Sequence, residues 1–199
     1  MSVSLRKNDK VNLSKQSHSL SKITLGLGWD VVNQSKKKGL FGFMSSVPNI
    51  DCDASAFMLD ANGKLASRSD IVFFGNLSSK CGSVIHNGDN LTGEGDGDDE
   101  QIVVDLNRVP SNIGEIVFVV NIYDAKSRGQ HFGMIENAFI RVVDNNTFRE
   151  LARFDLTNSY SGKTAMIFGS LKRVGNEWEF IAIGEGTDDN SVSELARRY

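Results

Sequence analysis

The sequence predicts a mainly β protein: a two-sheet β-sandwich with a few short helices, including a C-terminal one. Apolar and β-branched runs of roughly four to nine residues recur along the chain. Gly, Asn, Asp and Ser separate these runs, and the 199 residues include only 2 prolines. Strands that are this short and this regularly spaced are typical of two packed sheets.

Each predicted strand is an apolar or β-branched run bounded by turn residues. In chain order the strands are Ile23–Trp29, Ala54–Asp60, Ile71–Phe74, Ser83–His86, Ile102–Leu106, Ile116–Asp124, Ala138–Val143, Glu150–Asp155, Thr164–Val174 and Glu177–Gly184. The Asn-Gly pair in Asp60–Gly63 favours a tight turn, and Val174–Glu177 is typical of a hairpin. Because Ile116–Tyr123 is apolar at nearly every position, we expect it to lie centrally and to be covered on both faces.

Helical signals are sparse. They are a turn around Pro110–Ile113, a short helix near Ala125–Gly129, and a C-terminal helix from Ser191 to Arg198. The chain contains no repeat and no long linker, and its 199 residues suit one domain with a substantial core. We therefore expect a single domain over residues 1–199.

Composition indicates the compartment. The segment Met1–Lys10 has no apolar stretch of the kind found in export signals. No window approaches the roughly 18 to 20 apolar residues that a membrane span needs. Cys52 and Cys81 are then expected to be free thiols, and the protein to be cytoplasmic.

The segment Asn87–Gln101 is strongly acidic and rich in glycine. It holds four aspartates, two glutamates and four glycines, with no Lys or Arg. Crowded carboxylates repel one another unless a cation lies between them. Glycine lets such a loop curl, and ligands that are all oxygen suit calcium before magnesium. Zinc and copper fit poorly, because only His86 lies nearby and no Cys does.

A solvated acidic loop or a flexible linker is the alternative. The spacing also differs from that of an EF-hand, because Leu91 takes the third position counted from Asp89. The distribution of charge favours a cation site. The chain has 25 acidic and 22 basic residues, so that outside this loop 19 acidic residues stand against 22 basic ones.

Other acidic and amide side chains are candidates to complete such a site. Asp51 and Asp53 are two residues apart at a predicted strand, so their side chains share a face while Cys52 points away. The alternative is a solvated pair at an exposed strand edge. Asp124 either binds a ligand at the end of an apolar strand or caps the next turn. Asn137 supplies a neutral oxygen, and Asp30 is either a ligand or a turn former.

Little in the sequence indicates catalysis. The three histidines are far apart, and neither a nucleophile elbow nor a phosphate-binding glycine loop is present, so we expect no enzyme. The basic segment Val31–Asn49 contains three consecutive lysines followed by aromatic residues. It is either a mobile loop or a contact surface for a membrane or nucleic acid. We expect no nucleic-acid partner.

Several motifs resemble the TerD family of tellurium-resistance and stress-response proteins. The most specific is Gly88–Glu100, and the resemblance extends over nearly the whole chain, to about Gly186. The other matching segments are Ser2–Leu13, Gly26–Asp30, Asp51–Phe57, Ile122–Ala125, Phe132–Gly133, Asn137–Arg141 and Glu150–Leu156. The chain departs from the family pattern in its longer basic segment and in its tail, Thr187–Tyr199.

The resemblance implies a β-sandwich that binds two calcium ions and acts in tellurite resistance and stress as a binding or scaffold module. It implies other tellurium-resistance proteins, including a membrane partner, as partners. The metal ligands carried over by position are Asp89, Asn90, Glu94, Asp96, Asp98, Asp99 and Glu100, with Asp51, Asp53, Asp124 and Asn137 as neighbouring candidates.

A rival function is calcium-dependent binding of a small molecule, a cyclic nucleotide or an oxyanion. A resemblance to a cyclic-nucleotide-binding protein of slime moulds gives it a precedent. An acidic loop repels phosphate unless bound calcium inverts the local charge. A nucleotide that binds only in the presence of calcium would therefore favour this rival.

Overall fold

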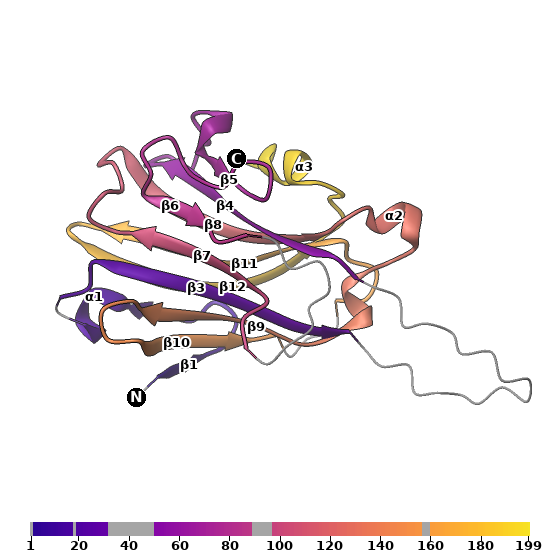
Figure 1. Ribbon diagram of the computed structural model, residues 1–199, viewed down its shortest axis with the longest axis horizontal. Coiled ribbons are helices and arrows are strands. Elements are labelled where there is room, and N and C mark those ends of the chain that lie inside the picture. Colours follow the sequence, from indigo (N-terminus) through magenta and orange to yellow (C-terminus); the bar gives the residue numbers. More distant parts are fainter. Residues whose placement is uncertain (1, 18, 32–49, 89–96, 157–159) are drawn as a thin grey trace, which may run out of the picture.

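The computed structural model describes residues 2–17, 19–31, 50–88, 97–156 and 160–199. These residues form two six-stranded sheets, which we name sheet A and sheet B (Figure 1). Sheet A has the order β1 (Val3–Leu5), β10 (Arg149–Asp155), β9 (Ile135–Asp144), β3 (Lys22–Val31), β7 (Glu100–Asp105), β6 (Val84–His86). Sheet B has the order β2 (Lys10–Asn12), β12 (Glu177–Thr187), β11 (Ala165–Val174), β8 (Ile113–Ile122), β4 (Cys52–Asp60), β5 (Ile71–Val72). The predicted two-sheet sandwich is confirmed.

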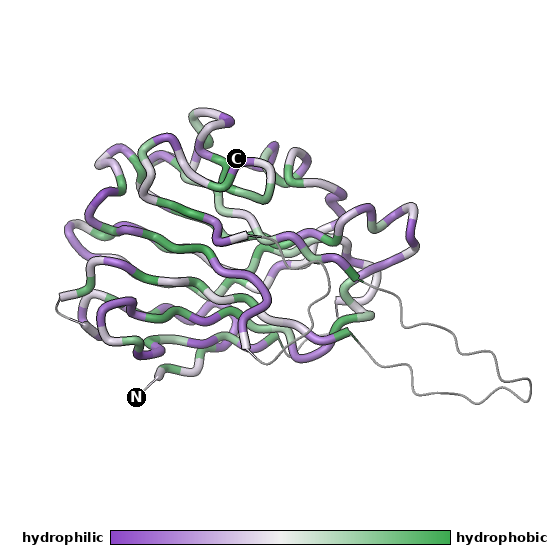
Figure 2. The backbone as a smooth tube through the Cα atoms, in the orientation of Figure 1, coloured by the Kyte–Doolittle hydropathy of each residue, from purple (hydrophilic) through white to green (hydrophobic). Residues whose placement is uncertain are grey.

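The two sheets share one hydrophobic core. In β7 buried and partly buried residues alternate, so that Ile102 and Val104 point into the core. Sheet B contributes Ile116 and Phe118 from β8, and both are fully buried. Figure 2 shows the hydrophobic residues running along the strands, with hydrophilic residues in many of the connecting turns. The period-two alternation in the sequence is the direct consequence of covering one face of each strand.

Strand β8 is covered on both faces, as predicted. It lies between β11 and β4 in sheet B. Its other face carries Val117 and Val119, which form a second buried cluster with Phe57 and with Leu195 of the C-terminal helix. That helix, α3 (Val192–Ala196), begins after Ser191, whose side chain accepts the main-chain N–H of Glu194. The expected C-terminal helix therefore covers sheet B.

Short elements near the N-terminus carried no clear signal. Strands β1 and β2 and helix α1 (Leu13–Gln16) have three or four residues each. The expected short helix after β8 is present as α2 (Ala125–Arg128). Two 3-10 turns were not predicted, η1 (Arg68–Asp70) and η2 (Phe132–Met134). None of the helices in the described residues is apolar and long enough to cross a membrane.

Most strand boundaries differ from the prediction by one to three residues, and three of these differences concern a turn or a candidate residue. Strand β5 ends at Val72 because Phe73–Asn76 closes a tight turn through reciprocal main-chain hydrogen bonds. Strand β8 ends at Ile122, which leaves Asp124 in the turn that follows. Strand β9 begins at Ile135 rather than Ala138, so Asn137 lies inside it. The hairpin between Val174 and Glu177 is confirmed.

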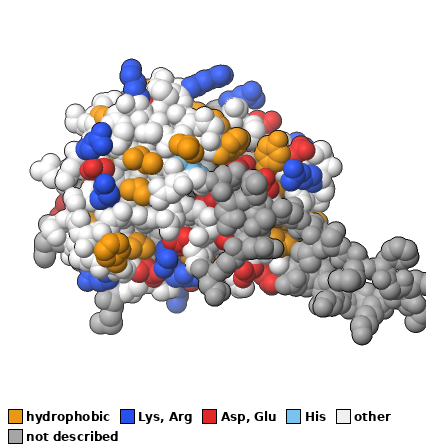
Figure 3. Space-filling view, viewed as in Figure 1, with side chains coloured by type: hydrophobic (Ala, Val, Ile, Leu, Met, Phe, Trp, Pro, Cys, Tyr) orange, Lys and Arg blue, Asp and Glu red, His pale blue; other side chains and the backbone are white. Residues whose placement is uncertain are grey.

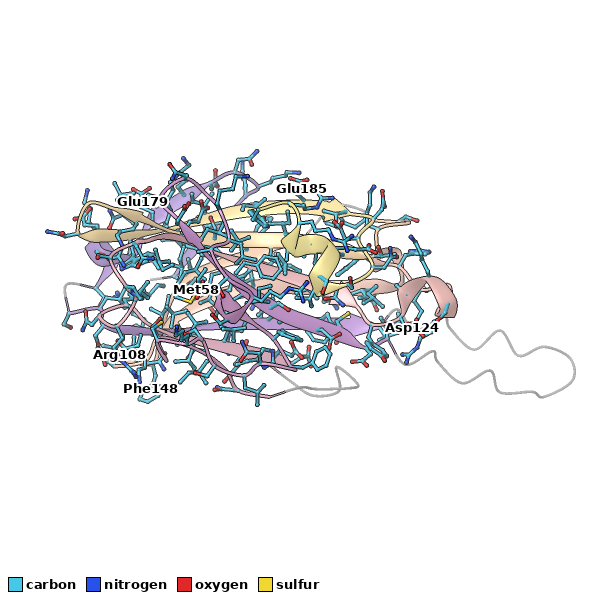
Figure 4. The ribbon with its side chains drawn as sticks, turned by 90° about the horizontal axis from the view of Figure 1, so that it is seen from above. Met58, Arg108, Asp124, Phe148, Glu179 and Glu185 are labelled. Carbon is cyan, nitrogen blue, oxygen red and sulfur yellow. The ribbon has the colours of Figure 1, made fainter. Side chains whose placement is uncertain are left out.

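The candidate residue Asp124 lies at one end of the sandwich. Figure 4 places Asp124 at the end opposite to Arg108 and Phe148. Acidic and basic side chains are interspersed over the face shown in Figure 3, among scattered hydrophobic ones. We call the end that carries Asp124 the acidic end.

The hairpin between β9 and β10, at the opposite end, is held by one buried carboxylate. Asp144 is fully buried, and it accepts the main-chain N–H of Asn146 at 2.9 Å. The hydroxyls of Thr147 and Ser17 donate to its other oxygen, each at 2.9 Å. Burial alone would raise the pKa of Asp144, but these hydrogen bonds outweigh it and lower the pKa below its ordinary value.

A lowered folded-state pKa means that this stabilisation is complete above the unfolded-state pKa of about 3.9 and is lost as the pH falls through the folded-state value. We expect Asp144→Asn to lower the free energy of unfolding by about 1–2 kcal/mol at pH 7. Urea unfolding between pH 7 and 2.5 should show this difference shrinking in acid. The control is Asp188→Asn, whose side chain is 72% exposed. A difference that is constant over the whole pH range would contradict the assignment.

Candidate metal centre

The described end of the acidic segment, Gly97–Gln101, lies where strands of both sheets meet. Its three consecutive acids contact three different strands. Four predicted ligands, Asp89, Asn90, Glu94 and Asp96, lie outside the described residues, as do residues 32–49 of the basic segment.

Asp98 is held by Arg141 of β9. The Nε of Arg141 donates to Oδ1 of Asp98 at 2.7 Å, and Nη2 donates to Oδ2 at 3.1 Å. Gln101 donates its side-chain amide to Oδ2 at 3.1 Å. The Asp98 side chain is only 2% exposed. The hydrogen bond with Asp98 raises the pKa of Arg141, which stays charged.

Asp99 turns toward β3 instead. Its Oδ2 accepts the main-chain N–H of Trp29 at 2.8 Å, and its own N–H donates to the carbonyl of Leu27 at 2.7 Å. Burial raises the pKa of Asp99, the Trp29 N–H opposes this, and the carboxylates of Asp30 and Asp98 add to the rise. Asp99 therefore lies among negative charges at the end of β3.

Glu100 points inward and bridges the two sheets. Its Oε2 accepts the main-chain N–H of Ala54 in β4 at 2.5 Å. Oε2 also lies 3.5 Å from Nε2 of His86, and both side chains are fully buried. Nδ1 of His86 accepts the N–H of Gly88, which leaves the imidazole proton on Nε2, facing Glu100. A side chain of sheet A thus accepts a hydrogen bond from the main chain of sheet B.

Asp51 and Asp53 flank this contact. The structure places Asp53 at 3% exposure, with Oδ2 3.5 Å from the side-chain amide of Asn121, so the alternative of a solvated exposed pair is wrong for Asp53. The carbonyl of Asp51 accepts the N–H of Tyr123. Cys52 points into the core, as the alternation predicted.

The thiol of Cys52 lies among acidic groups. Burial raises its pKa, and the charges of four carboxylates raise it further. In decreasing order of effect these are Glu100, Asp53, Asp51 and Asp99. Predicted ligands that are far apart in the sequence therefore lie around one point of β4.

The last two candidates have left-handed backbone conformations. Asp124 has a φ of 53° and is exposed at the start of α2, where its side chain makes no capping hydrogen bond. Asn137 has a φ of 55° and donates its amide to Oδ2 of Asp30 at 2.7 Å. The register of β3 against β9 shifts at this point, between Gly28 and Asp30. Asn137 is therefore the left-handed residue of a bulge that turns toward the acidic end.

The donor set suits a hard cation. The described candidates offer carboxylate and amide oxygens, while the two ring nitrogens of His86 already face the N–H of Gly88 and the carboxylate of Glu100. No three His, Cys, Asp or Glu side chains of the described residues lie close enough together to hold a metal ion by themselves. A complete centre therefore needs further oxygen ligands, as calcium with its six to eight ligands commonly does.

Sequence reasoning missed two structural partners of the loop. The first is the pairing of Arg141 with Asp98. The second is the role of Gly26 and Gly28 in β3, where a Cβ at residue 26 would lie 2.2 Å from the Asp98 carboxyl. At residue 28 a Cβ would lie 2.7 Å from the carbonyl of Gly97. Glycine inside a strand signals such a close approach, but it does not say what approaches.

A small pocket adjoins the acidic end. Its volume is about 110 Å³, and Asn137 and Glu136 line it together with apolar side chains that include Phe132, Leu156 and Met166. Sites for small molecules usually measure about 300 Å³ or more. This pocket therefore gives no support to a nucleotide-binding function.

Comparisons of the sequence with a family model and with known proteins all indicate the same family. The family model described as the TerD domain matches residues 1–199. Stress response protein SCP2 of Bacillus subtilis is 49% identical, with all of both chains covered. Tellurium resistance protein TerD of Serratia marcescens is 47% identical over 99% of this chain and 97% of its own length.

The fold is also similar to solved structures. The crystal structure of a protein of unknown function, SAV2460, has a TM-score of 0.67 and 27% sequence identity, and the match covers 89% of this chain and 95% of that one. A homologue of the telluride resistance protein TerD from Streptomyces coelicolor gives a TM-score of 0.62 at 22% identity, covering 88% and 95%. The second likeness concerns the fold alone.

Proposed function

The chain belongs to the TerD domain family, and we propose that it serves there as a calcium-binding module of tellurium resistance and stress response. In this proposal it acts as a binding or scaffold protein rather than as an enzyme. Its relatives include proteins named for tellurium resistance and for the general stress response. Those names support the biological setting, and the metal is argued from the acidic end.

The observation that carries the proposal is the way three consecutive acids converge on both sheets. Asp98 contacts β9, Asp99 contacts β3 and Glu100 contacts β4. These contacts fix the described end of the acidic segment against both sheets, and the charges of Glu100, Asp53, Asp51 and Asp99 all act on the thiol of Cys52. A divalent cation that is bound with further oxygen ligands would relieve the mutual repulsion of such carboxylates.

Calcium fits this set of donors better than the alternatives. Carboxylate, amide and main-chain oxygens are hard ligands, and a glycine-rich segment adapts to the large, irregular coordination shell of calcium. Magnesium demands a smaller, nearly octahedral shell and gives up its water reluctantly. We propose the eleven predicted acids and amides as the pool from which two calcium ions draw side-chain ligands.

The proposed partners and compartment follow the family. We propose a cytoplasmic protein that contacts other tellurium-resistance proteins, including a membrane partner, in its calcium-loaded state. Neutralising the acidic end by bound calcium would change which surfaces it attracts, since a carboxylate cluster repels acidic partners and bound cations do not.

Thermal unfolding of chelator-treated protein tests the metal directly. Calcium at 100 times its Kd should stabilise the folded state by about 2.7 kcal/mol. For a chain of this length that corresponds to a rise in Tm of roughly 5–10 °C. Magnesium at the same concentration is the control and should give a much smaller rise. No shift at millimolar calcium would leave the acidic segment as a solvated surface and remove the proposed function.

A further inference from the structure

Arg141 lies outside the set of predicted metal ligands, yet it donates two hydrogen bonds to Asp98 of the acidic segment. It is a residue of β9, where its Cα partners are Gly26 of β3 and Arg153 of β10. Its guanidinium binds both oxygens of Asp98, and Nη1 lies 3.6 Å from Oε2 of Glu150. A two-pronged contact of this kind fixes the orientation of the carboxylate as well as its position.

Gly26 of β3 also contacts the carboxylate of Asp98. A Cβ built at residue 26 would lie 2.2–2.3 Å from the carboxyl atoms of Asp98, so the carboxylate rests directly on the bare main chain of β3. Gly26 and Arg141 are neighbours across the two strands. Gln101 closes the seat from the side of β7 with its hydrogen bond to Oδ2. We call Gly26, Gln101 and Arg141 the Asp98 seat.

With Asp98 held in this seat, the side chains of Asp99 and Glu100 point in different directions. With Asp98 fixed on the outer side of β3 and β9, Asp99 bonds to Trp29. Glu100 then turns inward to Ala54. A carboxylate whose two oxygens already face a guanidinium is a poor first ligand for a second cation, because that cation would have to displace or repel Arg141.

We propose that Arg141 is a positioning residue of the calcium site: by holding Asp98 in its seat, it fixes residues 97–101 so that Asp99 faces the metal while Glu100 ties the segment to β4. Asp98 is then an anchor for the segment rather than a ligand. The inference rests on the proposed function insofar as calcium is the ligand that benefits. The fixing of residues 97–101 by Arg141 does not depend on any metal.

The direction in which loss of Arg141 changes calcium affinity distinguishes a positioning role from a purely electrostatic one. Arg141 is a cation beside an acidic segment, so its charge alone would weaken the binding of calcium, and its removal would tighten binding. A positioning role demands the opposite. Loss of Arg141 should weaken calcium binding about 10-fold or more, the effect typical of losing a group that orients metal ligands.

The experiment compares the wild type with Arg141→Met, Asp98→Asn and the double variant, using calcium alone as the ligand in titration calorimetry. Methionine keeps an unbranched apolar stem without the charge. We expect both single variants to lose affinity by a similar factor, and the double variant to lose no more than either, since the two residues act as one unit. Unchanged or tighter binding by Arg141→Met overturns the proposal. So does a much larger loss in Asp98→Asn that adds to the Arg141→Met effect, which would make Asp98 a ligand.

Arg153→Met is the matched control. Arg153 is the cross-strand neighbour of Arg141, but it pairs with Asp155 and stacks 3.8 Å from the ring centroid of Phe139 instead of touching Asp98. It removes the same charge from the same face of sheet A. Calcium affinity within about twofold of the wild type is expected for this variant, since surface substitutions away from a site have small effects.

Amide hydrogen exchange in the presence of chelator gives a readout that needs no calcium. The amides to follow are those of Asp99, which donates to Leu27, and Trp29, which donates to Asp99. Both should exchange faster in Arg141→Met and should be unchanged in Arg153→Met. Unchanged exchange in Arg141→Met overturns the positioning role whether or not calcium binds. A wild type that binds no calcium overturns the proposed function and, with it, the calcium half of this inference.

Discussion

The double substitution Asp89→Asn with Asp96→Asn weakens calcium binding by at least about 100-fold, equal to roughly 2.7 kcal/mol of binding free energy. Both aspartates belong to the acidic segment and are predicted ligands by position. Removing two anionic oxygens from a calcium site lowers its ligand charge, which is a principal determinant of calcium affinity. In chelator the double variant should be at least as stable as the wild type, because two repelling charges have been removed.

Titration calorimetry measures the affinity, and thermal unfolding in chelator measures the stability. The control is Asp105→Asn with Asp188→Asn, which changes the net charge by the same amount outside the acidic segment. The control should bind calcium as the wild type does, apart from a small long-range effect that salt screens. Equal affinity in the Asp89 and Asp96 double variant and the wild type would refute the ligand assignment.

Alanine at Glu100 destabilises the metal-free protein by about 3 kcal/mol, because breaking a buried charged contact leaves its partners unsatisfied. The N–H of Ala54 and Nε2 of His86 would both lose the carboxylate that faces them. A cavity would also open between the sheets. For a chain of this size the loss corresponds to a fall in Tm of roughly 6–12 °C.

Denaturant unfolding of Glu100→Ala in chelator checks this value apart from any effect on metal binding. Glu100→Gln should lose less, since its amide oxygen can still accept the Ala54 N–H. Glu136→Ala is the control, because Glu136 is an exposed glutamate of β9 whose loss should cost less than about 0.5 kcal/mol. A loss below 1 kcal/mol for Glu100→Ala would mean that this carboxylate does not tie the sheets together.

Much of the fold could be predicted because its causes are local. Alternating burial in β7 and the apolar run of β8 are visible in the sequence itself. The C-terminal helix was predicted as well, and its cap at Ser191 satisfies a donor in its own first turn. Strands β1 and β2, with three residues each, were not predicted, because so few residues carry no measurable period and owe their conformation to the strands beside them.

The acidic segment was also visible, since its six carboxylates lie close together in a short stretch of sequence. The partner of each acid was not visible. Asp98 bonds to a residue 43 positions away, Asp99 to one 70 positions away and Glu100 to one 46 positions away. Nothing in the local composition distinguishes the acid that turns outward to Arg141 from the acid that turns inward to Ala54.

The sequence by itself therefore determined the class of fold, the central strand and the existence of a concentrated acidic segment, because hydrophobic period and charge density are properties of neighbouring residues. Only the tertiary structure decided which strand each of the described carboxylates contacts. That choice depends on the order of the strands, which places Gly26 and Arg141 side by side beneath Asp98. Pairing of strands is a long-range property, fixed by the burial of the whole core.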